Sequence, residues 1–216
     1  MLNEGVRKLL PNRQYYNLDD LSIRTVHPSI LLDLAEEFGG DRNKLLTLAG
    51  ISKRTIASST ARISARQYIT LIEETMQATE SPGLGELHGR FIDVTATGQM
   101  ASLTMCCNTF GEAAFYAEKY YRLSGTVFDF ESQLRDKLNH IHLINRFPVD
   151  HKIQRFLIES WITSWLSHCQ FVLGTDFHFA TIKVTYPEPK HSTFYNDILV
   201  KKMAFNAELN EVTYDD

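Results

Sequence analysis

The sequence predicts an α+β fold, in which an N-terminal helical part is followed by a small, mostly antiparallel sheet packed with helices. Up to Gly125, apolar residues recur at helical spacing between capping residues and glycines. From Val127 onward, several segments alternate apolar and polar residues and are rich in β-branched and aromatic types. Because the helices cluster early and the strands late, this class is favoured over a parallel α/β sheet.

The composition fits a globular protein of one large domain or two small ones. The chain has 216 residues, of which 44% are hydrophobic and 22% charged, so it can bury a sizeable core. A net charge of −4 argues against the chain as a whole being a nucleic-acid-binding surface. The N-terminus has no apolar stretch typical of a signal peptide, and no apolar run approaches the ~20 residues that span a bilayer. We therefore expect a cytoplasmic protein that does not contact a membrane.

The first segment, residues 1–27, is polar and mixed, and we expect it to form an N-terminal arm. The rest of the chain, residues 28–216, is predicted to form one domain. Its first helix is expected to begin at Pro28 or Ser29, because proline is favoured in the first helical turn. The pair Gly39-Gly40 is expected to end this helix.

Capping residues mark the next helices. Asp41 is expected to cap a short helix, and Ser64 a longer one over residues 65–78, because both side chains can accept hydrogen bonds from exposed backbone amides. Residues 81–85 contain a proline and two glycines, and they are expected to form a turn or to start a short helix.

Residues 96–107 are predicted to form a helix, and the helix after it is predicted to begin with a capping box. In Thr109-Phe-Gly-Glu112, the Thr109 hydroxyl would accept a hydrogen bond from the Glu112 amide, and the Glu112 carboxylate would accept one from the Thr109 amide. We expect this helix to end near residues 124–125, a Ser-Gly pair.

The second half of the chain is predicted to contain the sheet, because the period of its apolar residues changes from helical to alternating. The expected elements are strands at 127–130 and 140–147 joined by a turn at 136–139, a helix at 150–173, a strand at 180–186, and a final pair of strands near 203–205 and 211–214.

Residues 43–59 permit a second interpretation, a helix-turn-helix that binds DNA directly. The segment contains a helix, an Ala-Gly-Ile-Ser turn and a second helical stretch, and basic residues surround it. Leu46 argues against this interpretation, because the position four residues before Gly50 usually holds a small side chain in such motifs. A self-contained DNA-binding protein that uses residues 43–59 is nevertheless the alternative function.

No motif for catalysis, phosphate binding or metal binding is present in the sequence. His140 and His142 share one face of the predicted strand, as two metal ligands would, but no third ligand is placed beside them. Cys106 and Cys107 are adjacent, which disfavours a disulfide between them, and we expect reduced thiols. We therefore expect no enzyme, no catalytic residue, no metal and no cofactor.

The helix at 150–173 is the best candidate for the wall of a ligand pocket. Trp161 and Trp165 fall on its broad apolar stripe, and His168 lies at the edge of that stripe. The alternative is that the two tryptophans only fill the core. Tyr120, on the preceding helix, is a further candidate for the lining of the pocket.

His142 and Arg146 are weaker candidates for ligand binding. They share one face of their strand, whereas Ile141, Leu143 and Asn145 share the other. If the apolar face meets the core, the cationic side chains face solvent and Asn145 points inward, and this arrangement is favoured. If both faces of the sheet are covered, His142 and Arg146 could bind a ligand carboxylate.

A set of short segments follows one another in an order and spacing typical of a known family. These segments are Leu84-Gly85, Thr109-Phe-Gly-Glu-Ala113, Lys119-Tyr-Tyr-Arg-Leu123, Trp161 with Trp165, Val184-x-Tyr186-Pro187-x-Pro189, Tyr195, and Met203-x-Phe205 with Val212-x-Tyr214. With them the chain resembles, over about residues 28–214, the N-terminal arabinose-binding-like effector domain of AraC-type transcription regulators. Ala204, where a basic residue is common, and Asp197-Ile198, where phenylalanine-glycine is usual, depart from the pattern.

The resemblance implies a bacterial transcription regulator. Residues 28–216 would then sense a small-molecule effector, such as a carboxylate or an apolar metabolite, and would form a homodimer. A C-terminal helix-turn-helix domain, absent from this chain, would contact DNA. No ligand-binding residue of the family transfers to this sequence by motif.

Overall fold

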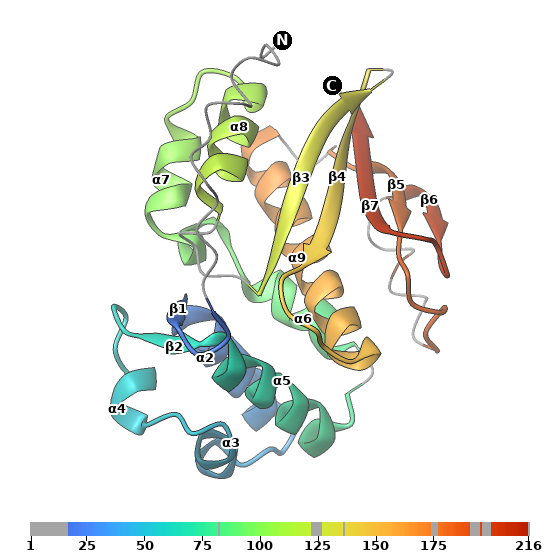
Figure 1. The fold of residues 1–216 in the computed structure, drawn as a ribbon. Helices are drawn as coiled ribbons and strands as arrows, with labels where there is room; N and C mark the ends of the chain where they lie inside the picture. Colours follow the sequence, from blue (N-terminus) through green and yellow to red (C-terminus); the bar gives the residue numbers. More distant parts are fainter. Residues whose placement is uncertain are drawn as a thin grey trace.

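The structure, a computed structural model, confirms the predicted α+β class (Figure 1). It describes residues 17–81, 83–121, 127–135, 137–173, 177–190, 195 and 200–215. A helical N-terminal part precedes a five-stranded sheet, and a two-stranded sheet lies among the first helices. None of the described helices is long and apolar enough to cross a membrane.

Short helices and a two-stranded sheet build the N-terminal part. Strand β1 (Leu21–Arg24) pairs antiparallel with β2 (Arg62–Ser64). The helices are α2 (Val26–Glu37), α3 (Arg42–Leu48), α4 (Lys53–Ile56) and α5 (Ala65–Thr79). Since β1 lies within the predicted arm of residues 1–27, the described end of that segment is part of the folded body; residues 1–16 lie outside the described residues.

The predicted caps of this part are confirmed. Helix α2 begins at Val26, slightly earlier than predicted, and Pro28 lies in its first turn, where a backbone donor is not needed. Asp41 accepts hydrogen bonds from two backbone amides of α3. Ser64 and Gln67 form a complete capping box at the start of α5.

The helix-turn-helix considered for residues 43–59 does not form. The chain turns at Gly50, whose φ is 64°, and α4 then has only 4 residues. One helical turn is too short to lie along the major groove as a recognition helix. The turn is also bound to α5, because the Gln67 side-chain amide donates to the Gly50 carbonyl at 2.6 Å. The segment therefore belongs to the packed N-terminal part.

Four short helical segments form the middle of the chain: α6 (Leu84–Phe91), the 3-10 helix η1 (Val94–Thr97), α7 (Gln99–Met105) and α8 (Phe110–Tyr120). The helix predicted at 96–107 is divided, because Gly98 has a φ of 64° at the junction of η1 and α7. Thr109 accepts from the Glu112 amide as predicted, but the Glu112 carboxylate accepts from the amide of Asn108, one residue earlier than predicted. The end of α8 predicted at 124–125 lies outside the described residues.

The main sheet has the strand order β3-β4-β7-β5-β6 (Figure 1). Its strands are β3 (Phe128–Arg135), β4 (Leu138–Asn145), β5 (Phe179–Lys183), β6 (Val200–Ala204) and β7 (Asn210–Asp215). β3 and β4 form the predicted hairpin. The last two strands were expected to form a pair, but β5 lies between them and β6 runs parallel to β5. The connection at 205–209 crosses over β5, so β6 and β7 follow one another in the sequence but are not neighbours in the sheet.

Helix α9 (His151–Leu173) lies along one face of this sheet (Figure 1). The strand register places Val212 directly between Ile141 and Ile182, and all three side chains are buried. Phe156 and Ile162 of α9 are buried in the same core. The alternation along β4 and β7 therefore turns one apolar face toward α9 and leaves the polar side chains on the opposite face.

Helix α6 packs against α9 at very short range, and two glycines make this possible. A Cβ atom at Gly85 would lie 2.6 Å from the carbonyl oxygen of Phe156. A Cβ atom at Gly89 would overlap the carbonyl oxygen of Ser160 and would lie 2.8 Å from the Cβ of Thr163. The backbone of α6 therefore touches α9 directly.

Candidate functional site

A pocket of about 150 Å³ lies between α8 and α9. Helix α9 forms one wall with residues from Leu157 to Val172, and α8 contributes Ala113 and Ala117, whose small side chains leave the space open. Residues of α2, α5, α6, η1, α7 and the start of β3 also contribute to the lining, which is mostly apolar. The described lining residues include no lysine, arginine, aspartate or glutamate.

Stacked tryptophans form the aromatic part of the wall. The rings of Trp161 and Trp165 are 5.4 Å apart between centroids and are inclined by only 9°. Phe130 of β3 lies 6.0 Å from each of them, and Phe128 lies 6.3 Å from Trp161. The strand therefore fixes the position of the two indole rings, and one row of aromatic side chains joins the sheet to the pocket.

His88 is a polar residue of the pocket lining, and its hydrogen bonds hold the ring in one tautomer. Its Nε2 lies 3.0 Å from the His27 carbonyl oxygen, which can only accept, so Nε2 carries the hydrogen. Its Nδ1 lies 2.8 Å from Ser160 Oγ and, in the neutral ring, accepts from that hydroxyl. Both ring nitrogens are thus satisfied within the protein, and we assign His88 a role in connecting α2, α6 and α9.

Three other ring nitrogens in the lining are buried without a partner among the described residues. They are Nε2 of His27, Nε1 of Trp165 and Nε2 of His168. Buried polar atoms are nearly always hydrogen-bonded, and leaving one unsatisfied costs about 1–3 kcal/mol. Three such atoms around one pocket therefore require partners from outside the chain, either water or a bound molecule.

The pKa values of the pocket histidines are low. Burial lowers the pKa of His27 to about 3, and the nearby His88 and Arg24 add to this effect. Burial also lowers the pKa of His88 to about 4, although its bond to the His27 carbonyl opposes the shift. His168 is shifted downward by burial too, against backbone hydrogen bonds that raise its pKa. All three rings are therefore neutral at pH 7.

These low pKa values predict a loss of stability in mild acid. The unfolded chain binds protons on His27 and His88 near pH 6.5, whereas the folded chain binds them only near pH 3–4. Stability is therefore fully present above pH 6.5 and falls as the pH drops below it, by on the order of 2 kcal/mol per histidine from pH 7 to pH 5. Urea unfolding at both pH values measures this loss. We expect His27→Gln to reduce the pH dependence and the exposed-site control His151→Gln to leave it unchanged; equal dependence in both variants would contradict the assignment.

The structure brings some of the candidate ligand residues together and separates others. Trp161, Trp165 and His168 all line the pocket. Tyr120 does not line it; its ring stacks on Tyr116 at 6.2 Å, on the same helix. The pocket thus gathers the three candidates of α9 only.

The remaining candidates, His142 and Arg146, also lie outside the lining. Arg146 lies over the ring of Phe147, at 5.5 Å from its centroid. His142 is on the face of β4 away from α9, as the favoured arrangement predicted. Asn145 is exposed instead of pointing inward, because β4 continues past the end of β7, which pairs with it only up to Leu143.

Sequence reasoning missed several residues of the pocket. His27 and His88 come from α2 and α6 and meet Ser160 only in the folded chain. Neither histidine belongs to a local pattern. Ala113 and Ala117 could have been found from the sequence. Small residues four positions apart on an amphipathic helix either let a neighbouring helix approach closely or leave a cavity beside it.

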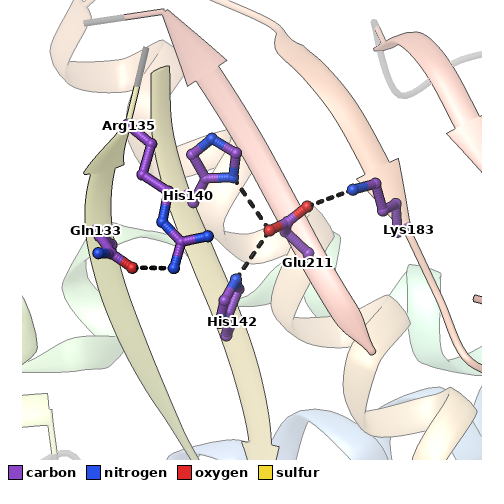
Figure 2. A network of polar contacts seen from close by, with 6 residues as sticks. All are labelled: Gln133, Arg135, His140, His142, Lys183 and Glu211. Carbon is purple, nitrogen blue, oxygen red and sulfur yellow. Dashed lines mark hydrogen bonds and ion pairs between the residues drawn. The ribbon is translucent and has the colours of Figure 1, made fainter. Parts of the chain in front are cut away.

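A second polar cluster lies on the opposite face of the sheet and is centred on Glu211 (Figure 2). Its Oε2 accepts hydrogen bonds from His142 at 2.8 Å and from His140 at 3.1 Å. Its Oε1 accepts from Lys183 at 2.7 Å. The carboxylate that His142 was considered to bind is therefore the protein's own, and the cluster ties β4, β7 and β5 together.

Glu211 is expected to stabilise the fold above pH 4.5. Burial opposes its ionisation, but the hydrogen bonds from Lys183, His140 and His142 outweigh this and lower its pKa from 4.5 to about 2. The stabilisation is thus present above pH 4.5 and is lost as the pH falls toward 2, in total on the order of 2 kcal/mol. Glu211→Gln should unfold at a lower urea concentration than the wild type at pH 7. The two should converge toward pH 2; a constant difference at every pH would refute this reading.

The described residues give no support for a metal site or for a reactive thiol. Among the described residues, no group of three or more histidine, cysteine, aspartate or glutamate side chains is arranged to hold a metal ion. Cys169 lines the pocket, and burial raises the pKa of its thiol. Burial, Glu112 and Cys106 likewise raise the pKa of Cys107. Neither Cys169 nor Cys107 is activated as a thiolate.

The chain is similar to known transcription regulators. Residues 39–216 match the family described as the arabinose-binding domain of AraC transcription regulators, N-terminal. The ornithine utilization regulator of Pseudomonas aeruginosa is 24% identical over 186 residues, which cover 86% of this chain and 55% of that protein. The crystal structure of the transcriptional regulator CdpR from Pseudomonas aeruginosa has a similar fold, with a TM-score of 0.60 and 11% identity over 94% of this chain and 56% of that one. The chain thus spans about half the length of these relatives.

Proposed function

This chain belongs to the family of N-terminal arabinose-binding domains of AraC transcription regulators, and from that premise we propose that it is the ligand-sensing and dimerisation domain of such a regulator. In this proposal it acts in the cytoplasm as a homodimer and binds a small-molecule effector. The bound and free states then control DNA binding by a C-terminal domain outside this chain. The proposed task is regulatory and involves no catalytic step.

The observation that carries the proposal is the pocket with its unsatisfied ring nitrogens. A cavity that stays empty is apolar throughout, whereas polar atoms in a cavity require water or a ligand as partners. This one combines stacked indole rings with buried nitrogens of His27, Trp165 and His168 that lack partners. A mostly apolar pocket with a few convergent polar atoms is the usual form of a small-molecule site.

The relative named for ornithine utilization does not supply the effector of this chain. At neutral pH ornithine carries two ammonium groups and one carboxylate, and burying such charges requires charged partners. The described lining of the pocket has none. We therefore infer that this chain responds to a different class of molecule, whichever compound acts on its relative.

The position of the pocket gives a route from ligand to regulation. Its walls belong to α8 on one side and to α9 on the other, and α9 also packs on α6 and on the sheet. A ligand that contacts both helices stabilises the arrangement in which they are close. Such a differential affinity for one arrangement shifts the population toward it, which is what a sensor requires.

Thermal-shift screening tests the sensing part of this proposal. A ligand of the native state must raise the melting temperature, and the expected increase is several degrees at about 100 times the dissociation constant. The screen should include neutral aromatics, carboxylates, amino acids and fatty acids. The proposal fails if no compound raises the melting temperature, or if the hits act equally on a variant whose pocket is filled.

Light scattering and DNA titration test the remaining parts. The chain alone should have the mass of a dimer at tens of micromolar, and it should not bind duplex DNA with a steep dependence on salt. A monomer at high concentration would remove dimerisation from the proposal. Micromolar DNA binding by the chain alone would contradict the assignment of DNA contact to another domain.

A further inference from the structure

We propose that the pocket between α8 and α9 takes a neutral molecule with a single aromatic ring and a polar head that both accepts and donates a hydrogen bond, of the phenol or aromatic amide type. This inference rests on the proposed function and names the class of its effector. It follows from the size of the pocket, the absence of charge in its described lining, and the placement of its unsatisfied nitrogens.

The size of the pocket suits a ligand of about one ring. Its volume of about 150 Å³ is enough for a benzene ring, since engineered apolar cavities of that volume take one up. A planar ring can also pack against the stacked indoles of Trp161 and Trp165, which already lie parallel within 9°. For a ligand of about eight non-hydrogen atoms, the expected dissociation constant lies between roughly 10 µM and 1 mM.

The electrostatics of the pocket exclude charged ligands. No described lining residue carries a formal charge, and burial keeps His27, His88 and His168 neutral at pH 7. Among the described lining residues, an ammonium group would find no carboxylate and a carboxylate would find no permanent cation. Because burying an unpaired charge is far more costly than burying a hydrogen-bonded neutral group, a neutral head is favoured.

The unsatisfied nitrogens specify the chemistry of that head. The indole Nε1 of Trp165 can only donate, so it requires an acceptor. The imidazole Nε2 of His168 can accept in its neutral form, and it then requires a donor. Since the two residues are three positions apart on α9, they are neighbours on one helical face. A single hydroxyl or carboxamide can therefore satisfy both.

Titration calorimetry with four matched probes tests this inference. The probes are p-cresol, which has the ring and the hydroxyl; toluene, which has the ring alone; and benzoate and benzylamine, which carry a negative and a positive charge. On the wild-type chain at pH 7.5 we expect p-cresol to bind about tenfold more tightly than toluene, as one satisfied buried hydrogen bond implies. Benzoate and benzylamine should each bind at least about tenfold more weakly than p-cresol.

Two variants locate the hydrogen bond. Trp165→Phe keeps an aromatic ring but removes the donor, so the ratio of p-cresol to toluene affinity should fall from about tenfold to about two. Trp161→Phe is the matched control, because it removes a similar ring area while the Trp161 nitrogen is not among the unsatisfied atoms. Its ratio should stay near tenfold. Each ratio compares p-cresol with toluene on the same variant, so a variant that is only partly folded does not distort its ratio.

The inference is overturned if a charged probe binds more tightly than p-cresol, if the ratio is unchanged in Trp165→Phe, or if p-cresol fails to bind at millimolar concentration. These failures differ from a failure of the proposed function. If the thermal-shift screen then finds another compound whose binding a filled pocket abolishes, only the ligand class is wrong. If that screen also finds nothing, the sensing role falls with it.

Discussion

Replacing Gly89 by alanine is expected to destabilise the fold by roughly 2–4 kcal/mol. In an ordinary helix this change is favourable by up to about 1 kcal/mol, because alanine has the higher helix propensity. Here the added Cβ would overlap the carbonyl oxygen of Ser160, which is backbone and cannot turn aside. Helix α6 would have to move away from α9, and the contacts that bury His88 and Phe156 would loosen with it.

Urea unfolding, followed by tryptophan fluorescence, measures this effect. Gly111→Ala is the matched control, because Gly111 lies in the first turn of α8 and a Cβ there meets nothing within 4 Å. That variant should be as stable as the wild type or up to about 1 kcal/mol more stable. If Gly89→Ala behaved like the control, the close packing of α6 on α9 would be wrong.

Replacing Ala117 by phenylalanine is expected to abolish ligand binding in the pocket, with a loss of at least about 100-fold in affinity. The Ala117 side chain lies in the lining, and a phenyl ring added there would occupy most of the available 150 Å³. The ring would take the place of the ligand instead of creating a clash, so we expect the fold to tolerate it at a cost below about 3 kcal/mol. Calorimetry with p-cresol, with circular dichroism to confirm folding, measures the outcome.

Lys119→Phe serves as the control for this experiment. Lys119 lies on the same helix as Ala117 but is exposed, so the same ring is added away from the pocket. This variant should bind p-cresol as the wild type does. If Ala117→Phe remained folded and retained binding, the ligand would have to bind elsewhere, and the polar cluster around Glu211 would become the next surface to test (Figure 2).

Features that depend on a few neighbouring residues could be predicted from the sequence. Asp41 and Ser64 cap their helices as expected, because a cap is a contact between residues two or three positions apart. The β3–β4 hairpin was predicted for the same reason. In the capping box at Thr109 the error is a single residue, since Glu112 is bonded by the amide of Asn108.

Features that depend on distant contacts could not be predicted in this way. The order of the last strands is set by packing across the whole sheet, so β5 lies between β6 and β7. In the pocket, the stripe of α9 gave Trp161, Trp165 and His168, because helical spacing is local. His27 and His88 lie 61 positions apart and meet only after α2 and α6 have packed. The low pKa values of these histidines arise from burial in the folded chain, which no short sequence pattern predicts.

The central claim is that the pocket between α8 and α9 binds a small neutral molecule through the Trp165 indole. The chain has 2 tryptophans, and both line this pocket, so a ¹H–¹⁵N correlation spectrum has two indole signals that report on it. Trp165→Phe assigns them. On titration with p-cresol, we predict that the Trp165 indole signal shifts, because the N–H gains a hydrogen bond and the ligand ring packs beside it, with the dissociation constant found by calorimetry. If both indole signals stay in place while p-cresol binds, the claim is wrong.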